Sequence, residues 1–344
     1  MTRIRRSLLA AAVAASLLPL AAAGASAEEV NVYSSRHYDA DLEIYNAFTA
    51  ETGIDINLIE DNAGALIERV KAEGANSPAD VLITVDAANL AAAANAGLFQ
   101  PAGSAVLDER VPENLRHPEG LWYALTKRAR VIMYRKGDVD VTGLERYEDL
   151  ADPRFAGMIC IRSSSNEYNQ SLVSSLIAVN GADATGVWID GLVANMAREP
   201  ESNDTGQIKA VAAGECDIAV ANTYYLARLV SSDDPDDRAA GEAIGVILPN
   251  QGDRGTHINV SGAGVMAHAP NRDNAVRFIE FLASDEAQNL FAEGNYEWPV
   301  VGTVPHAVIL DDLYGDFVED DLNPALYGAN RVEALELMES HGWK

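Results

Sequence analysis

Tyrosine is the residue type in this sequence whose number and placement best suggest chemistry. The chain holds 12 Tyr against 7 Phe. Four tyrosines follow directly after predicted strands that lie far apart in the chain, namely Tyr38, Tyr168 and the adjacent pair Tyr224 and Tyr225. Ligands of open α/β sheets bind beyond the carboxyl ends of the strands. We therefore expect these four phenols to meet at one binding site.

Clustered phenols suit a hard, highly charged metal ion. A phenol has a pKa near ~10, so it is neutral at pH 7 unless a cation stabilises the phenolate. Phenolate oxygen is a hard donor, which favours Fe(III) over soft metals. Several phenolates would exceed the ferric charge, so arginines are expected nearby. Arg228 follows the tyrosine pair by one helical turn, and Arg128 and Arg130 lie on one face of an extended segment.

Tyr224 and Tyr225 are adjacent in the chain, which restricts how both can reach one ion. Neighbouring side chains point apart on a regular helix or strand. Tyr224 and Tyr225 can therefore reach one ion only at an irregular junction between elements.

Motifs of other chemistries are not found. The sequence contains no Gly-x-Ser-x-Gly, no phosphate-binding glycine loop and no Cys-x-x-Cys. Its two cysteines, Cys160 and Cys216, fit either two buried thiols or a disulfide, which export would allow. Carboxylate pairs carry no information in a chain with 52 Asp and Glu.

The N-terminus has the three parts of a secretory signal peptide. Arg3, Arg5 and Arg6 precede a short apolar run over 7–20, and a small-residue site predicts cleavage after Ala27. The apolar run is shorter than the ~20 residues that span a membrane. We expect a periplasmic protein that is exported by the Sec route or, given the twin arginines, by the Tat route.

The charge of the chain is strongly negative. With 25 Lys and Arg, the formal net charge is −27, and removing the three signal-peptide arginines lowers it to −30. Such a surface repels phosphates and anionic lipids, so no nucleic acid and no membrane surface is expected as a partner. The acidity fits either general solubility or adaptation to a saline habitat.

Strand-like and helix-like segments alternate, which predicts an α/β protein with a mostly parallel sheet. Helices are expected over 39–52, 64–74 and 87–96, each after a buried strand. Two long extended segments, 122–134 and 256–267, are expected to cross between two lobes. The acidic run 231–238 is expected to be a surface loop.

With these residues in view, the sequence resembles the FutA-type ferric-iron-binding proteins, within the FbpA-like, transferrin-type group of solute-binding proteins. The resemblance extends over nearly the whole chain after the signal peptide. It rests on the segments 32–38 (Val-Tyr-Ser-Ser-Arg-His-Tyr), 74–82, 126–131, 162–172 (with Ser-Ser-Ser-Asn-Glu-Tyr-Asn-Gln), 221–225 (Ala-Asn-Thr-Tyr-Tyr) and 254–262.

This resemblance implies a two-lobed periplasmic binding protein fold of type II, with the ligand cleft between the lobes. After the signal peptide (1–27), the N-terminal lobe would comprise 28–125 and 255–307, and the C-terminal lobe 126–254 and 308–344. The implied iron ligands are Tyr38, Tyr168, Tyr224 and Tyr225, with His37 a ligand in some members only. Arg128 and Arg228 would line the cleft and balance charge.

The resemblance also implies a role. The protein would be a monomer without enzymatic activity, would carry Fe(III) as transported ligand and not as catalytic cofactor, and would deliver it to an ABC permease and its ATPase at the inner membrane. Two alternatives stay open. One is a binding protein for another solute, an oxyanion or a polyamine, and the other is a tyrosinate–Fe(III) enzyme.

Overall fold

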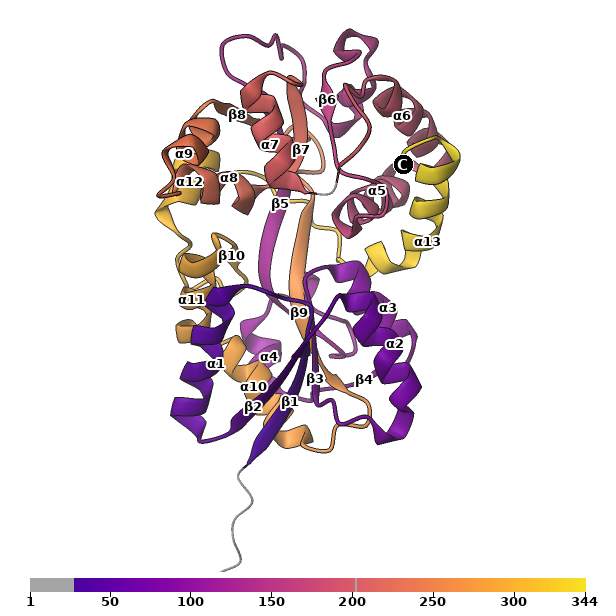
Figure 1. Cartoon of the computed structure of the whole chain (residues 1–344). Coiled ribbons are helices and arrows are strands. Elements are labelled where there is room, and N and C mark those ends of the chain that lie inside the picture. Colours follow the sequence, from indigo (N-terminus) through magenta and orange to yellow (C-terminus); the bar gives the residue numbers. More distant parts are fainter. Residues whose placement is uncertain (1–27, 202) are drawn as a thin grey trace, which may run out of the picture.

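The computed structural model describes residues 28–201 and 203–344, and it has two lobes, one above the other in Figure 1. The predicted signal peptide and its cleavage site lie outside the described residues. Two strands, β5 (Tyr123–Arg135) and β9 (Ile258–Met266), run along the middle of the molecule (Figure 1). The two extended segments predicted to cross between the lobes correspond to these strands, and the predicted lobe boundaries themselves stay a prediction.

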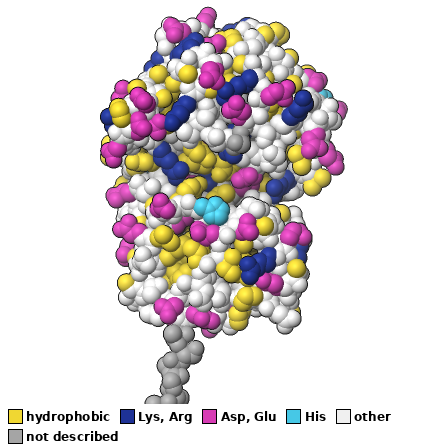
Figure 2. Space-filling model, viewed as in Figure 1, with side chains coloured by type: hydrophobic (Ala, Val, Ile, Leu, Met, Phe, Trp, Pro, Cys, Tyr) yellow, Lys and Arg dark blue, Asp and Glu magenta, His cyan; other side chains and the backbone are white. Residues whose placement is uncertain are grey.

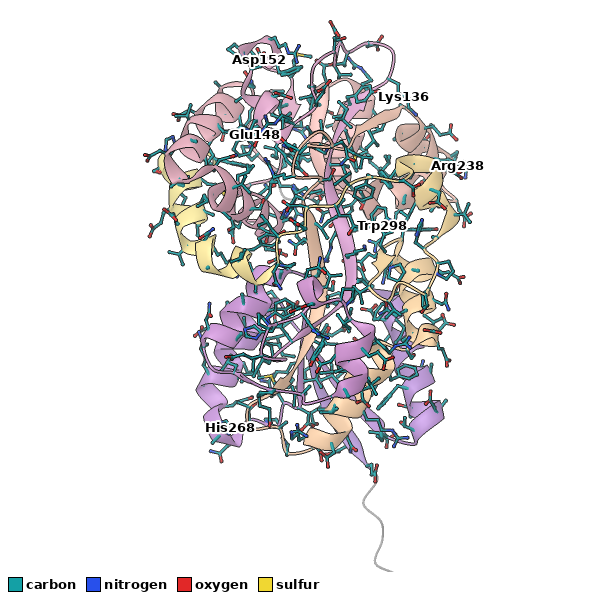
Figure 3. All side chains as sticks on the ribbon, turned by 180° about the vertical axis from the view of Figure 1, so that it is seen from behind. Lys136, Glu148, Asp152, Arg238, His268 and Trp298 are labelled. Atoms are coloured by element: carbon teal, nitrogen blue, oxygen red, sulfur yellow. A yellow bond between two sulfur atoms is a disulfide. The ribbon has the colours of Figure 1, made fainter. Side chains whose placement is uncertain are left out.

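The lower lobe is built on one mixed sheet. β1 (Glu29–Ser34) pairs in parallel with β2 (Asp55–Glu60) and β3 (Val81–Thr84). β9 pairs antiparallel with β3, β4 (Phe99–Gln100) and β5, and the short β10 (Trp298–Pro299) also pairs with β5. Seen from behind, Trp298 lies beside the crossing strands (Figure 3).

Helices cover both faces of this lower sheet (Figure 1). They are α1 (Asp39–Thr52), α2 (Ala63–Glu73), α3 (Ala87–Asn95), α4 (Ala105–Arg110), α10 (Arg272–Leu282) and α11 (Asp285–Asn295). α1 matches its predicted range and ends at Gly53, whose φ of +73° is the left-handed conformation that glycine adopts most readily. The core between sheet and helices is apolar, with Phe48, Phe278 and Phe281 in contact.

In the upper lobe, β5 continues between two further strands. It pairs antiparallel with β7 (Ile218–Asn222) and β8 (Ile244–Ile247), and β7 pairs in parallel with β6 (Ile159–Cys160). The helices are α5 (Glu167–Asn180), α6 (Ala182–Ala194), α7 (Asp204–Ala213), α8 (Thr223–Val230), α9 (Pro235–Glu242) and α12 (Val308–Tyr314). Short 3-10 turns lie at Gly74–Asn76, Glu113–Leu115, Tyr147–Ala151 and Pro153–Phe155.

Two predictions about local structure were wrong. The sheet is mixed and not mostly parallel, because β5 and β9 run antiparallel to their neighbours as they cross the molecule. The acidic run 231–238 is not only a loop, because α9 begins within it. Asp234 accepts the backbone N–H of Asp236 as N-cap, and Pro235 occupies the first helical position.

The last helix, α13 (Ala325–Ser340), contacts both lobes through α3 and α5 (Figure 1). Its early residue Tyr327 belongs to the lower core, whereas Ala334 and Met338 belong to the upper one. Cys160 and Cys216 form a disulfide, which decides between the two possibilities left open by the sequence. Among the described residues, no helix is long and apolar enough to cross a membrane.

Candidate functional site

Tyr38 comes from the lower lobe. It stands between β1 and α1 as the N-cap residue of α1, with extended backbone (φ −100°, ψ 129°). Its ring is half-buried and meets two cations. The guanidinium carbon of Arg36 lies 4.8 Å from the ring centroid and that of Arg228 lies 4.9 Å away. Arg228 belongs to α8, so a residue of the upper lobe contacts this tyrosine of the lower lobe.

Tyr168 comes from the upper lobe, at the second position of α5. The side chain of Asn166 caps this helix by accepting the Tyr168 backbone N–H at 3.2 Å. The Tyr168 side chain is buried, with 6% of its surface exposed. Its ring centroid lies 5.2 Å from the guanidinium carbon of Arg162 and 6.0 Å from that of Arg128.

Tyr224 and Tyr225 lie in the first turn of α8, directly after β7 ends at Asn222. Their rings do not diverge as on a regular helix surface, because the centroids are 4.3 Å apart at an interplanar angle of 37°. The Tyr224 hydroxyl is fully buried and lies 3.4 Å from the hydroxyl of Tyr168. The strand-to-helix junction thus places both phenols of the pair beside the third.

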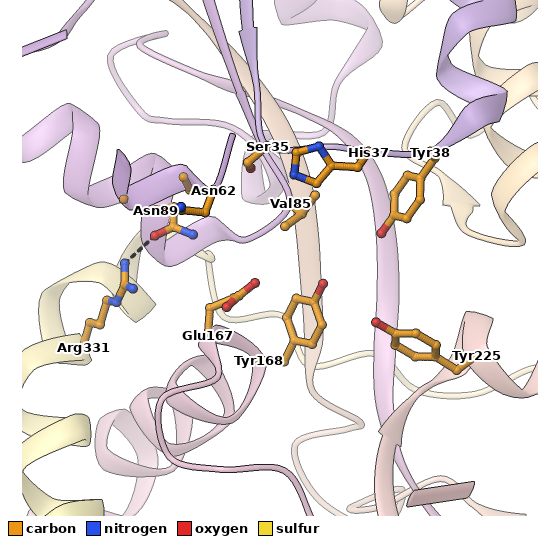
Figure 4. A pocket seen from close by; sticks show the side chains of 12 residues that line it. Ser35, His37, Tyr38, Asn62, Val85, Asn89, Glu167, Tyr168, Tyr225 and Arg331 are labelled. Atoms are coloured by element: carbon orange, nitrogen blue, oxygen red, sulfur yellow. Dashed lines mark hydrogen bonds between the residues drawn. The ribbon is translucent and has the colours of Figure 1, made fainter. Parts of the chain in front are cut away.

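Tyr38, Tyr168 and Tyr225 border one cavity of about 460 Å³ between the lobes. Tyr224 does not line it but is buried directly behind it, with its hydroxyl 3.4 Å from that of Tyr168. Figure 4 shows the hydroxyls of Tyr38, Tyr168 and Tyr225 pointing toward a common region. The cavity is lined by Ser35, His37, Tyr38, Asn62, Ala63, Gly64, Val85, Asn89, Glu167, Tyr168, Tyr225 and Arg331. On the surface, a hollow crosses the molecule between the lobes, while acidic side chains are scattered over both lobes (Figure 2).

His37 also borders the cavity, but it is solvent-exposed. Its side chain is 54% exposed, and its Nδ1 lies 3.8 Å from the carboxylate of Glu60. The imidazole thus lies beside Glu60 on the solvent-exposed side of the cavity.

The two predicted arginines lie on different sides of the phenols. Arg128 is completely buried and donates from Nη2 to the Val85 carbonyl at 2.6 Å and to Ser261 Oγ at 3.0 Å. Its Nε lies 3.4 Å from the buried carboxylate of Glu297. Arg228 is half-buried and lies 5.0 Å from the Tyr224 ring centroid. Positive charge thus approaches the phenol cluster from two directions.

Burial makes these phenols hard to ionise without a cation. It is the largest cause that raises the pKa of Tyr168 and Tyr224 well above that of a free phenol, and the neighbouring tyrosines add to the effect. The guanidinium of Arg128 acts in the opposite direction on both. Burial and the nearby Asp204 carboxylate also raise the pKa of Tyr225. A trivalent ion at this position would supply the charge that ionises them.

Sequence reasoning did not single out several residues of the site. Arg36 lies inside the segment 32–38 used for the resemblance, yet its contact with Tyr38 is a matter of side-chain packing. Arg331 comes from α13, far along the chain, and donates to the side chains of Gln170 and Asn89. Nothing in its local sequence distinguishes it as a residue of the site.

The described residues offer no competing metal centre. No group of three or more His, Cys, Asp or Glu side chains gathers in 28–201 or 203–344 in a way that could hold an ion.

Known proteins share this fold and length. The chain is 53% identical to iron uptake protein A1 of Synechocystis sp., and the alignment covers 95% of this chain and 90% of that protein. It is 30% identical to the major ferric iron-binding protein of Neisseria meningitidis, covering 89% of this chain and 88% of that one. The solved structure of Trichodesmium FutA (IdiA) with iron and citrate ligands matches 92% of this chain and 100% of its own, at 52% identity and a TM-score of 0.88.

The fold and the family predicted from sequence are thereby confirmed. The structural neighbours have the type II periplasmic binding protein fold, with the cleft between two lobes. The family model of bacterial extracellular solute-binding proteins matches residues 34–289. The chain belongs to this family, the bacterial extracellular solute-binding proteins, and within it is similar to the FutA-type iron-uptake proteins.

Proposed function

We propose that this protein captures Fe(III) through the phenolates of Tyr38, Tyr168, Tyr224 and Tyr225. The observation that carries the proposal is the gathering of four phenols from three separate segments and both lobes: Tyr38, Tyr168 and Tyr225 line one cavity, and Tyr224 contacts Tyr168 and Tyr225 directly behind it. Hard anionic oxygen donors without thiols match the preference of ferric iron. Iron-binding proteins are also among its closely similar relatives, including one whose structure holds iron and citrate.

The surrounding charges support a trivalent ion. Four phenolates would carry one more negative charge than Fe(III) neutralises, and Arg128 and Arg228 lie where they can offset that excess. His37 at the cavity rim is a fifth candidate ligand, which a turn of its exposed imidazole would bring toward the ion.

Capture would close the lobes on the ion, and no turnover is involved. Tyr38 lies in the lower lobe and the other three phenols in the upper lobe, so a shared ion binds the two halves together. Its family relates this chain to ABC importers. We therefore propose that the exported protein acts as a monomer in the periplasm and passes iron to a permease and its ATPase.

The alternatives fit the cavity less well. A polyamine needs several carboxylates, and Glu167 is the sole acidic residue among those that line the cavity. An oxyanion site gathers helix N-termini and hydroxyls without clustered phenols. A tyrosinate–Fe(III) enzyme needs further imidazole ligands, and His37 is the one histidine at the cavity.

The test is to add ferric citrate to the purified apo-protein and to record the visible absorption spectrum. Phenolate-to-iron charge transfer gives a coloured complex, which we expect for the wild-type protein at one iron per chain. Tyr224→Phe and Tyr225→Phe should each weaken or shift the band. A colourless wild-type protein would contradict the iron assignment, and oxygen uptake with catechols would instead support the enzyme.

A further inference from the structure

A continuous chain of polar side chains runs behind the tyrosines and joins the two arginines that flank them. It runs from Arg228 in α8 through Asn295 in α11, Asp41 in α1, Arg36 after β1 and Glu297 before β10 to Arg128 in β5. All except Arg228 are at most 2% exposed. The links from Arg228 to Glu297 are hydrogen bonds, and such buried bonds hold their members in one arrangement. The last link is an ion pair alone, because Arg128 Nε and Glu297 Oε1 lie 3.4 Å apart and neither has a hydrogen-bond partner among the described residues.

The centre of this chain is the ion pair between Arg36 and Asp41. The guanidinium donates from Nε and Nη2 to the two carboxylate oxygens at 2.8 and 3.0 Å, which is a bidentate geometry. Arg36 Nη1 also donates to Ser261 Oγ at 2.7 Å and to Glu297 at 3.2 Å. Since Ser261 belongs to β9, the pair is anchored on a strand that runs between the lobes.

Asn295 connects this buried centre to Arg228. Its Oδ1 accepts from Arg228 Nη2 at 3.2 Å, and its Nδ2 donates to Asp41 Oδ1 at 3.3 Å. A carboxamide offers an acceptor to a cation on one side and a donor to a carboxylate on the other. Asn295 is the last residue of α11 in the lower lobe, whereas Arg228 belongs to α8 in the upper lobe. The contact therefore spans the two lobes.

We propose that Asn295 is a positioning residue that holds the Arg228 guanidinium against the rings of Tyr38 and Tyr224. This inference rests on the proposed function, because it assigns Asn295 a role in the stability of the iron–phenolate complex. Arg228 lies 4.9 Å from the Tyr38 ring centroid and 5.0 Å from that of Tyr224, one tyrosine from each lobe. Without the carboxamide, this long side chain is free to move toward solvent, and its charge no longer offsets the phenolates.

The experiment is a double-mutant cycle on iron release. The ferric protein is mixed with an excess of a strong chelator, and the decay of the visible band gives the release rate. We expect Asn295→Ala to release iron roughly 10-fold faster than wild type, within the range seen when a partner of a metal ligand is removed. Arg228→Gln should accelerate release at least as much. The double variant should release iron no faster than Arg228→Gln alone, because Asn295 acts through Arg228.

A matched control lies on the same helix. Asn289 is exposed, and its Nδ2 donates to the Asp285 carbonyl of α11, so it is not a member of this chain of polar side chains. Asn289→Ala should release iron at the wild-type rate. If Asn295→Ala does not fold, Asn295→Gln replaces it, since its carboxamide keeps both an acceptor for Arg228 and a donor for Asp41 and should release iron more slowly than Arg228→Gln.

The outcomes separate this inference from the proposed function. Additive effects of Asn295→Ala and Arg228→Gln, or release by Asn295→Gln as fast as by Arg228→Gln, would overturn the positioning role while the band itself persists. A wild-type protein without any band would instead refute iron binding, whatever the variants do.

Discussion

The hydroxyl of Tyr224 lies 3.4 Å from the hydroxyl of Tyr168, although 56 residues separate them in the chain. The two phenols reach each other because β6 and β7 are parallel neighbours, and each strand is followed by a helix that carries a tyrosine in its first turn. Two neutral phenols at this separation make only a weak hydrogen bond. This hydrogen bond therefore contributes little to the stability of the fold.

Removing the Tyr224 hydroxyl should therefore affect iron more than folding. We expect Tyr224→Phe to lower the affinity for Fe(III) by more than about 100-fold, since a lost ligand exceeds the effect of a lost ligand partner. The free energy of unfolding should change by less than about 1 kcal/mol, because the ring still fills its site and the hydrogen bond is weak. Competition with citrate and urea denaturation measure the two effects.

Tyr314→Phe is a matched control for this variant. Tyr314 is also buried, and its hydroxyl donates to the Thr223 carbonyl at 2.6 Å, next to the tyrosine pair but outside the cavity. Loss of the Tyr314 hydroxyl should lower the free energy of unfolding by about 1 kcal/mol and leave the affinity for iron unchanged. The reverse pattern, with affinity lost in Tyr314→Phe and kept in Tyr224→Phe, would exclude Tyr224 as a ligand.

Iron binding should release protons. Burial raises the pKa of Tyr168, Tyr224 and Tyr225, so these phenols are protonated at pH 7 in the apo-protein, and each one that binds iron loses its proton. The affinity should then increase with pH, by up to about tenfold per pH unit for each phenol. Calorimetry in two buffers of different ionisation enthalpy counts the protons. Tyr225→Phe should release one proton fewer, and an equal count would remove it from the ligand set.

Much of the local structure and of the phenol cluster could be predicted from sequence. The helix over 39–52 has an apolar face and a glycine stop, and both signals act within the segment itself. The convergence of Tyr38, Tyr168 and the tyrosine pair could be inferred because each follows a strand, and strand ends define the binding edge of such sheets.

What the sequence could not predict depends on partners distant in the chain. The Arg36–Asp41 pair is local, but its link to Glu297 spans 261 residues, and no pattern indicates it. Likewise, α13 contacts both lobes, so its residues cannot be assigned by sequence order to one of them. The acidic composition of 231–238 favours a loop, whereas the helix there begins because Asp234 is an N-cap that is followed by proline.

The disulfide is expected to stabilise the upper lobe substantially. It joins Cys160 in β6 to Cys216, just before β7, across a separation of 56 residues. Closing a loop of this length in the unfolded chain corresponds to about 4 kcal/mol in the chain-entropy model. We expect the variant with both cysteines changed to alanine to lose up to this amount of unfolding free energy in urea. Mass spectrometry of the unreduced protein should find both thiols blocked to alkylation, and two reactive thiols would contradict the bond.

A buried histidine should make stability depend on pH in mildly acidic solution. Burial, aided by the charges of Arg130 and Arg254, lowers the pKa of His257 to about 3, and its ring lies 4.9 Å from that of Tyr327. In the unfolded chain the pKa is near ~6.5. The unfolded state thus binds the extra proton first, so the stabilisation is complete above pH ~6.5 and is lost as the pH falls toward 3.

Between pH 6.5 and 5.5 this histidine alone should remove up to about 1.4 kcal/mol of unfolding free energy. Urea denaturation at the two pH values measures the loss, and His257→Phe should abolish that part of it while keeping an aromatic ring against Tyr327. His268 is exposed at the far end of the lower lobe (Figure 3), so His268→Asn should behave as wild type. An unchanged pH dependence in His257→Phe would show that His257 is already charged in the folded protein or that other groups govern its acid stability.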